Sequence, residues 1–407
     1  MKLYILKGLL KRSRKRITLI IELFFSFLAF FLVLSFIVKE INNSKYPLGF
    51  DYRNLYTLQW DIDETAGDWN SIQKTQNEIL EFIKSDPGVE EYGNCMSSFF
   101  FNKGYMNPSQ PLKTNNVALP PTQINQILAK DDFPAVLGLQ ILEGRWFSAE
   151  DNASKNRPVV LTQNLREQLF RSGKALGEIV EYCGQQCIVV GVCNNIKHKG
   201  DYTQPDLTIF IRNTEVENLQ YENWMCMSGS NCGPSNFIKA KNVNGAFEAG
   251  LTREVATKFP GYRIKLFSLG KIRQNYIRST WAPLITIFFV VLSLFLNVLF
   301  GLFGVLWYNI SQRKSEIGLR MAVGASKTRV YQQFITEMLL LASVAIIPGI
   351  VIAIQFPILN LLDIEPVVYI IAIIAAAILI YGLVTICALL PSSRATKIQP
   401  AIALHEE

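Results

Sequence analysis

The chain has 407 residues, of which 50% are hydrophobic and 18% are charged, and its formal net charge is +7. This apolar excess argues against an ordinary soluble protein and predicts a membrane protein of two or three domains. The basic charge does not indicate nucleic-acid binding, because it lies at the N-terminus and in one central loop, next to apolar segments. Basic clusters in such places are typical of the cytosolic ends of membrane spans.

The N-terminal region predicts a surface helix followed by a membrane span. Residues 1–16 mix apolar and basic side chains, as in a cytosolic helix lying on membrane lipid. Residues 17–40 predict the first transmembrane helix and its stalk, because the apolar part is about 33 Å long as a helix. A cleaved signal peptide is the alternative, but the segment is too long and lacks a small-x-small cleavage site. For Glu22, snorkelling toward Arg16 is favoured over a functional role.

Residues 41–276 predict a large extracytoplasmic, periplasmic domain, since Pro, Gly, Asn and Asp return and no long apolar run occurs. Both ends of this region show a strand, an amphipathic helix and a second strand. The first unit comprises residues 55–60, 69–85 and 89–101, and the second comprises 236–240, 247–259 and 262–267. Two such units predict one α+β subdomain that is split in sequence by an inserted lobe.

The inserted lobe is expected over residues 120–212. Its segments alternate apolar and polar residues, which predicts a mostly β structure. Gly144 and Arg145 are interpreted as a turn in which Arg145 pairs with Glu150 or Asp151, rather than as a ligand site.

Three further membrane spans follow this domain. Trp281 and Trp307 lie about 39 Å apart on a helix, as expected of residues in the two interfacial belts of a membrane. Asn297 and Glu337 interrupt the apolar runs, and helix–helix contacts are favoured over a transport role for both. The second span and its stalk are predicted at 277–310, the third span at 334–356 and the fourth at 367–390.

The charges of the connecting segments predict the orientation in the membrane. The connection 357–366 contains Asp363 and Glu365 but no Lys or Arg, so it is expected outside. The tail 391–407 then returns to the cytosol. Both termini are therefore predicted to be cytosolic, and the large domain lies outside the cytoplasmic membrane.

The cytosolic loop 311–333 contains a short, regular segment. As a helix it places Gly318, Ala322 and Ala325 on one small-residue stripe, with Glu316 and Arg320 spaced for an ion pair. Gly324 suits the left-handed turn that ends a helix. Such a helix fits a groove on another protein, and a solvated helix next to the membrane is the alternative.

Two stretches resemble one known family. Residues 313–325 resemble the signature of the MacB/FtsX-like permeases of ABC transporters, and residues 138–148 resemble the extracytoplasmic domain of the same family. The resemblance implies that the cytosolic segment is a coupling helix docked on a separate ATPase. Residues with an implied role in this coupling are Arg313, Glu316, Ile317, Gly318, Arg320, Ala322 and Gly324.

The family also implies a mechanism and partners. Two permease copies or homologues combine with two ATPase subunits, and closure of the ATPases moves the outside domains through the stalks of the first two spans. Export of antimicrobial compounds or peptides, with a periplasmic adaptor and an outer-membrane channel, is the favoured function. Lipoprotein release, or a signal relay to a cell-wall hydrolase, is the alternative. ATP and magnesium are expected on the partner ATPase, and no cofactor on this chain.

No catalytic constellation is evident in the sequence. Its two histidines, His198 and His405, neighbour no plausible nucleophile with an orienting group. The stretch 245–252 resembles a phosphate loop only superficially, because Leu251 stands where lysine is required. We therefore do not expect the chain to be an enzyme.

Six of the seven cysteines fall in the outside domain. An oxidising compartment favours disulfides among them, with fifteen pairings for six cysteines. Cys183 and Cys187 are candidates to bridge a hairpin, and Cys226 and Cys232 to close a loop. Cys193 is a further candidate. A metal site of Cys183, Cys187, Cys193 and His198 is a less favoured alternative, because oxidation competes with it.

Overall fold

The computed structural model describes residues 14–62, 69–96, 100–101, 111–114, 117–120, 124–171, 173–213, 234–242, 245–312, 326–359, 361 and 364–395. The chain divides into two compact units. One unit comprises residues 1–42 and 281–407, and the other comprises residues 43–280. Every strand of the described chain lies in the second unit.

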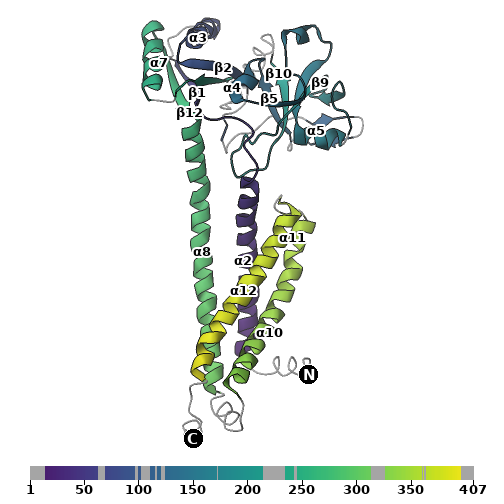
Figure 1. Ribbon diagram of the computed structural model, residues 1–407, viewed down its shortest axis with the longest axis vertical. Coiled ribbons are helices and arrows are strands. Elements are labelled where there is room, and N and C mark those ends of the chain that lie inside the picture. Colours follow the sequence, from purple (N-terminus) through teal and green to yellow (C-terminus); the bar gives the residue numbers. More distant parts are fainter. Residues whose placement is uncertain are drawn as a thin grey trace. The chain divides into compact units, whose positions relative to one another are not determined.

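The first unit is built from four apolar helices (Figure 1). They are α2 (Arg14–Ser44), α8 (Leu269–Gln312), α10 (Lys327–Ala353) and α12 (Pro366–Ala395), with the short α11 (Gln355–Ile358) after α10. Each is long and apolar enough to cross a membrane, over Ile17–Ser44, Leu269–Gly304, Ile335–Ile358 and Pro366–Cys387. The four predicted spans are thus confirmed.

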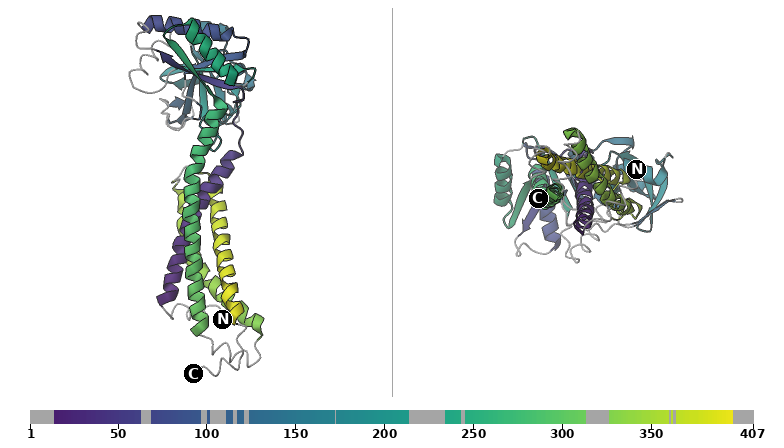
Figure 2. Two further views of the ribbon diagram at one scale, coloured as in Figure 1. Left: turned by 90° about the vertical axis from the view of Figure 1, so that its left-hand side faces the viewer. Right: turned by 90° about the horizontal axis from the view of Figure 1, so that it is seen from below.

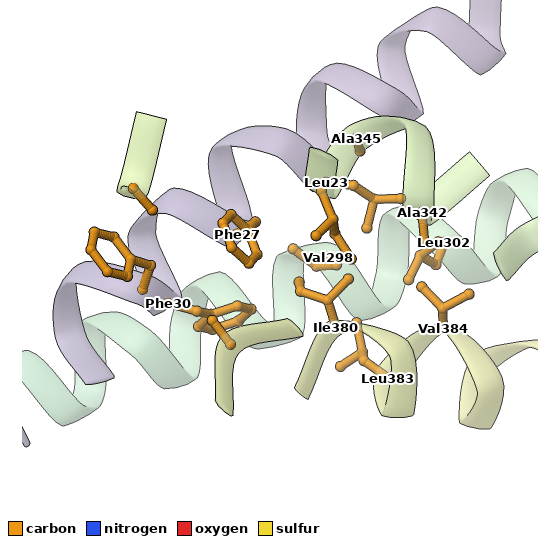
Figure 3. Close-up of a cluster of buried hydrophobic side chains, with 14 of the residues drawn as sticks. Leu23, Phe27, Phe30, Val298, Leu302, Ala342, Ala345, Ile380, Leu383 and Val384 are labelled. Carbon is orange, nitrogen blue, oxygen red and sulfur yellow. The ribbon is translucent and has the colours of Figure 1, made fainter. Parts of the chain in front are cut away.

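The four helices share one apolar core, and their membrane parts lie side by side (Figures 1 and 2). Each helix contributes buried side chains to it (Figure 3). The labelled examples are Leu23, Phe27 and Phe30 of α2, Val298 and Leu302 of α8, Ala342 and Ala345 of α10, and Ile380, Leu383 and Val384 of α12. Alanines in such a core let helix backbones approach closely, which is how membrane helices gain packing energy.

Two glycines allow especially close helix contacts in this core. A Cβ atom on Gly349 of α10 would lie 2.5 Å from Cδ1 of Phe27. A Cβ atom on Gly301 of α8 would collide with the carboxylate of Glu22, which is half-buried on α2. The predicted pairing of Glu22 with Arg16 lies outside the described side chains. The Glu22 carboxylate packs against Gly301 of α8.

The other polar residues of the spans differ in their surroundings. Glu337 is half-buried on α10. Asn297 of α8 is exposed, so the described part of the chain does not show the predicted helix–helix contact of Asn297.

The second unit contains the split subdomain that the sequence predicts. Its strands are β1 (Leu55–Ile62), β2 (Val89–Met96), β11 (Pro234–Ala240) and β12 (Tyr262–Ser268), and its helices are α3 (Trp69–Lys84) and α7 (Gly245–Lys258). The strands lie in the order β12-β1-β11-β2, and all neighbours are antiparallel. Two β-α-β units interleaved in this way form a ferredoxin-like arrangement. β2 ends at Met96, earlier than the predicted residue 101.

The alternation of side chains explains why both faces of this sheet are covered. Tyr56 and Leu58 of β1 pack with Ile79 of α3 and Val255 of α7 in one core. Leu55 points to the opposite face and joins a second core. Successive strand residues point to opposite faces, so a strand with apolar residues on both must be buried on both.

The inserted lobe replaces the hairpin that would otherwise join β2 to β11. Its strands are β3 (Leu112–Lys113), β4 (Ala118–Leu119), β5 (Ile124–Ala129), β6 (Ile141–Gly144), β7 (Arg157–Thr162), β8 (Ile179–Tyr182), β9 (Gln185–Cys193) and β10 (Leu207–Arg212). Short helices interrupt them: α4 (Phe133–Leu137), the 3-10 turn Ala149–Ala153 and α5 (Gln163–Phe170).

The lobe sheet has the order β5-β10-β7-β9-β8-β3-β4, and β6 pairs with β9. It joins the ferredoxin-like sheet where Cys95 and Met96 of β2 pair with Ala129 and Leu128 of β5. β3 and β4 precede residue 120, so the lobe begins earlier in the chain than the sequence predicts. Its mostly β character is as expected.

We predict that Gly349→Val disturbs the membrane core, because the new methyl groups must displace the ring of Phe27. Overpacking of this kind costs about 1–3 kcal/mol. The thermal midpoint of the purified chain in detergent should fall. Gly382→Val on α12 is the matched control, because nothing lies within 4 Å of a Cβ atom at Gly382. Equal midpoints for the two variants would contradict this packing.

Candidate functional site

A densely hydrogen-bonded polar feature of the second unit is the loop Ile196–Asp206 between β9 and β10, here called the anchor loop. Loops are normally exposed and polar. In this loop Lys197 and His198 are each 1% exposed, and Ile196 is fully buried. A buried lysine is rare unless its charge is compensated.

Lys197 closes the end of α2. Its Nζ atom donates hydrogen bonds to the carbonyl oxygens of Asn43 (2.7 Å), Tyr46 (2.9 Å) and Asp201 (2.6 Å). The last carbonyls of a helix lack partners within the helix, and a cation there also interacts favourably with the helix dipole. An ammonium group has three N–H donors, and all three are used here.

The end of α2 returns a hydrogen bond to the same loop. The Nδ2 atom of Asn43 donates to the carbonyl oxygen of Tyr202 at 2.9 Å. Burial lowers the pKa of Lys197, and the nearby carboxylates of Asp201 and Asp206 oppose this shift. Because only the charged amine supplies three donors, the site is built for the ammonium form.

The anchor loop also holds the beginning of α8. The guanidinium of Arg273 donates to both carboxylate oxygens of Asp201, at 2.9 and 2.5 Å. This fork-to-fork pairing is among the stronger charge-assisted arrangements. The same guanidinium lies over the ring of Tyr52, 4.3 Å from its centroid.

A glycine completes the contact with α8. Gly200 has φ of 117°, and a Cβ atom there would collide with the ring of Tyr276. Only glycine meets both demands, a left-handed backbone and room for the aromatic ring.

The anchor loop is itself fixed to the lobe. The backbone N–H of His198 donates to Oδ2 of Asp206 at 2.8 Å, and the N–H of Asp206 donates to the carbonyl of Ile196 at 2.9 Å. Asn164 of α5 donates to the carbonyl oxygens of Pro205 and Asp206, each at 3.1 Å. The loop therefore ties the end of α2 and the start of α8 to the inserted lobe.

The predicted site residues have different outcomes. The ATPase-coupling residues 313–325 lie outside the described residues, so their role stays a prediction. Arg145 pairs with Asp151 through two hydrogen bonds of 2.8 and 2.6 Å, which confirms the turn interpretation. The Arg145 guanidinium holds the pKa of Asp151 below its usual range.

The predicted hairpin disulfide is not formed. Cys183, Cys187 and Cys193 are free thiols, and Cys226 and Cys232 lie outside the described residues. Cys183 occupies the turn between β8 and β9 and is exposed, whereas Cys187 is 1% exposed and faces the lobe core. Burial raises the pKa of Cys187 to about 11 and that of Cys193 to about 12, so both remain protonated.

A β-bulge also separates the alternative metal ligands. Val159 pairs with Val189 but Val160 pairs with Gly191, so Val190 is the extra residue. The bulge reverses the alternation of β9: Cys187 packs in one core and Cys193 in another. In the described part of the chain, no group of three His, Cys, Asp or Glu residues is placed to hold a metal ion.

No sequence pattern singled out Lys197, Asp201 or Arg273 as functional residues. Lys197 contacts residues about 150 positions earlier in the chain, at separations of 154 and 151. Arg273 lies 72 positions from Asp201. No local pattern connects these residues, so only the folded structure brings them together.

Family models match both parts of the chain. A model described as the MacB-like periplasmic core domain matches residues 23–242, which is more than half of the chain. A model described as the FtsX-like permease C-terminal segment matches residues 274–400. These two matches agree with the resemblance seen in the sequence.

Individual relatives are distant. The chain is 26% identical to the uncharacterized ABC transporter permease YvrN of Bacillus subtilis, over 83% of this chain and 80% of the relative. It is 28% identical to the macrolide export ATP-binding/permease protein MacB 1/2 of Paracoccus denitrificans, over 54% of this chain. The chain spans 32% of the length of that exporter.

Two solved structures are similar. The periplasmic region of MacB from Actinobacillus actinomycetemcomitans matches 55% of this chain and 92% of that structure, with a TM-score of 0.36 and 16% identity. The extracellular domain of the noncanonic ABC-type transporter YknZ from Gram-positive bacteria matches 52% of this chain and 99% of that structure, with a TM-score of 0.34 and 15% identity.

We predict that Lys197→Met destabilises the second unit, because the carbonyls of Asn43, Tyr46 and Asp201 would lose their donor, and the contact with the Asn43 carbonyl is buried. Each orphaned buried group costs about 1–3 kcal/mol. The thermal midpoint of the full chain should fall. Lys199→Met is the matched control, because the Lys199 side chain is 59% exposed and its ion pair with Asp206 is 3.8 Å long. If both variants melt alike, Lys197 does not hold α2.

Proposed function

Because this chain belongs to the family of ABC transporter permeases with a MacB-like periplasmic core domain and an FtsX-like C-terminal segment, we propose that it couples ATP hydrolysis by a separate ATPase to movement of its outside domain. The observation that carries this proposal is the anchor loop. One loop holds the ends of both helices that continue into the membrane unit.

The two helices are suited to pass on a displacement. α8 contains 44 residues without a break, which corresponds to about 66 Å at the rise of an α-helix. α2 contains 31 residues, or about 46 Å. Both exceed the hydrocarbon thickness of about 30 Å. A continuous helix is stiff along its axis. A displacement of its cytosolic end therefore also displaces the end that is hydrogen-bonded to the anchor loop.

The ATPase is proposed to dock on the cytosolic segment 313–325. In this account Glu316, Ile317, Gly318, Arg320, Ala322 and Gly324 contact the ATPase, and Arg313 meets acidic groups at its groove. ATP and Mg²⁺ bind to that partner, which performs the hydrolysis. The chain itself supplies the docking helix and the stalks.

The proposed cargo class is an antimicrobial compound or peptide, exported from outside the cytoplasmic membrane. Relatives named as macrolide exporters support this class. A periplasmic adaptor and an outer-membrane channel are proposed partners where an outer membrane exists. The distribution of Lys and Arg supports an orientation with both termini in the cytosol.

We predict that an ATPase co-purifies with the native chain in detergent and is lost from the variant Gly318→Trp, Ala322→Trp. Bulky rings on the small-residue stripe should block docking. Gln332→Trp is the matched control, because Gln332 is exposed at the cytosolic end of α10 and outside the stripe. Failure of the native chain to retain an ATPase, or equal retention by all three proteins, would contradict the docking role.

We further predict that Arg273→Met uncouples the complex. The ATPase should stay bound and active, because Arg273 lies far along the chain from the docking segment. Macrolide resistance of cells expressing both subunits should fall about tenfold. The exchanged pair Asp201→Arg with Arg273→Asp restores an ion pair and should recover part of the resistance. Full resistance of Arg273→Met would show that the anchor loop does not transmit movement.

A further inference from the structure

Two consecutive asparagines near the end of α2 bond to different parts of the chain. The Nδ2 atom of Asn43 donates to the carbonyl oxygen of Tyr202 in the second unit. The Nδ2 atom of Asn42 donates to Oε2 of Glu365 at 3.2 Å, and both of these residues belong to the first unit. The end of α2 is therefore held by the membrane helices as well as by the anchor loop.

Glu365 belongs to the segment that leads from α10 to α12. This segment begins after Ala353, passes through a turn at Ile354 and α11, and ends where Glu365 directly precedes α12. The carbonyl oxygen of Glu365 accepts from the N–H of Val368 at 2.9 Å, which fixes Glu365 to the first turn of α12. Its carboxylate is thus presented from a defined position.

Three aromatic rings pack the same segment against α2. The ring of Phe31 lies edge-on to that of Phe356, with centroids 5.4 Å apart, and 6.2 Å from that of Tyr369. The rings of Phe356 and Tyr369 are 6.4 Å apart, so the three form a closed triangle. Phe31 and Tyr369 are fully buried. Aromatic pairs of this geometry stabilise a contact beyond the area they bury.

The two contacts lie on one face of α2. Phe31 and Asn42 are about three helical turns, or about 16 Å, apart along the axis. Ser35 and Val38 lie between them on the same face. Ser35 is fully buried and its hydroxyl donates to the carbonyl oxygen of Phe31, while Val38 packs against the membrane core. This face therefore has an aromatic contact at one end, a polar contact at the other and small or aliphatic side chains between.

The two ends of this face respond differently to a shift of α2 along its axis. Apolar contacts have no preferred direction, and aromatic pairs stay favourable over centroid distances of about 4.5–7 Å. The hydrogen bond between Asn42 and Glu365 is lost when its atoms separate by about a further 0.5 Å. This bond therefore distinguishes one axial position of α2 from its neighbours.

We propose that Asn42 and Glu365 are positioning residues that fix the resting position of α2. The segment from α10 to α12 is the stop against which α2 rests, and the bond opens when ATP binding displaces α2. This inference rests on the proposed function, in which α2 moves in each ATPase cycle.

The test is a distance measurement in the full complex with its ATPase. Spin labels are placed on genetically encoded keto amino acids at Ile41 and Val367, which are 55% and 61% exposed, so that Asn42, Glu365 and the native cysteines stay intact. Trapping with magnesium, ATP and vanadate should lengthen this distance. The matched control pair is Ile358 and Val367, because both belong to the stop or to the helix after it, and their distance should stay constant.

An unchanged distance between positions 41 and 367 on trapping would overturn the proposal. So would an equal change in the control pair, because the stop would then not be a fixed reference.

Substitutions separate the hydrogen bond from mere proximity. Without nucleotide, Asn42→Ala and Glu365→Ala should each raise the population at the longer, trapped distance about fivefold. Glu365→Gln keeps an acceptor oxygen and should retain the native distribution. A bond that only stabilises the fold would lower the thermal midpoint of the alanine variants without populating the trapped distance, and this result would overturn the positioning role.

A covalent tether gives the opposite change. Joining Asn42→Cys to Glu365→Cys with a short, reducible thiol cross-linker should lower the ATPase rate of the complex about tenfold, and a reducing agent should restore it. The native chain treated in the same way is the control for its seven cysteines. A full ATPase rate in the tethered complex would overturn the proposal.

The failure of this proposal differs from the failure of the proposed function. A bound, active ATPase together with a constant distance between positions 41 and 367 would overturn the stop and leave ATPase docking standing. Absence of any co-purifying ATPase would overturn both.

Discussion

A buried ammonium group on three backbone carbonyls is the interaction on which the second unit depends. The end of α2 exposes carbonyls that no residue of the helix itself can satisfy. Lys197 reaches them from a loop about 150 residues later in the chain. The helix end and the lobe therefore become ordered together, because either alone would leave a charge or several acceptors buried without partners.

The two stalk helices are attached to the sheet in different ways. α8 begins at Leu269, directly after the last residue of β12, so the ferredoxin-like sheet continues covalently into it. α2 has no such strand, and it is joined through side chains of the anchor loop. Asp201 links both systems, since its backbone carbonyl accepts from Lys197 while its carboxylate pairs with Arg273. The anchor loop thus contacts both the end of α2 and the start of α8, which lie far apart in the sequence.

Sequence patterns predicted the parts of this protein that depend on local periodicity. The four spans and the two β-α-β units follow from apolar runs and from periods of 3.6 and 2. Arg145 and Asp151 were predictable as partners because they lie only six positions apart in the chain. The anchor loop was not predictable, because its contacts join residues from opposite ends of the domain. The hairpin disulfide was wrongly predicted from spacing alone, because Cys183 lies in an exposed turn while Cys187 faces the lobe core.

The position of the inserted lobe has a consequence for how such a domain can change over time. The lobe is inserted between β2 and β11, which are antiparallel neighbours that a simple hairpin could connect. A lobe at this place can be enlarged or reshaped for a different task while α2 and α8 stay attached to the same ferredoxin-like sheet. One requirement limits that freedom. The lobe carries Lys197, and any replacement has to bring its own cation to close α2.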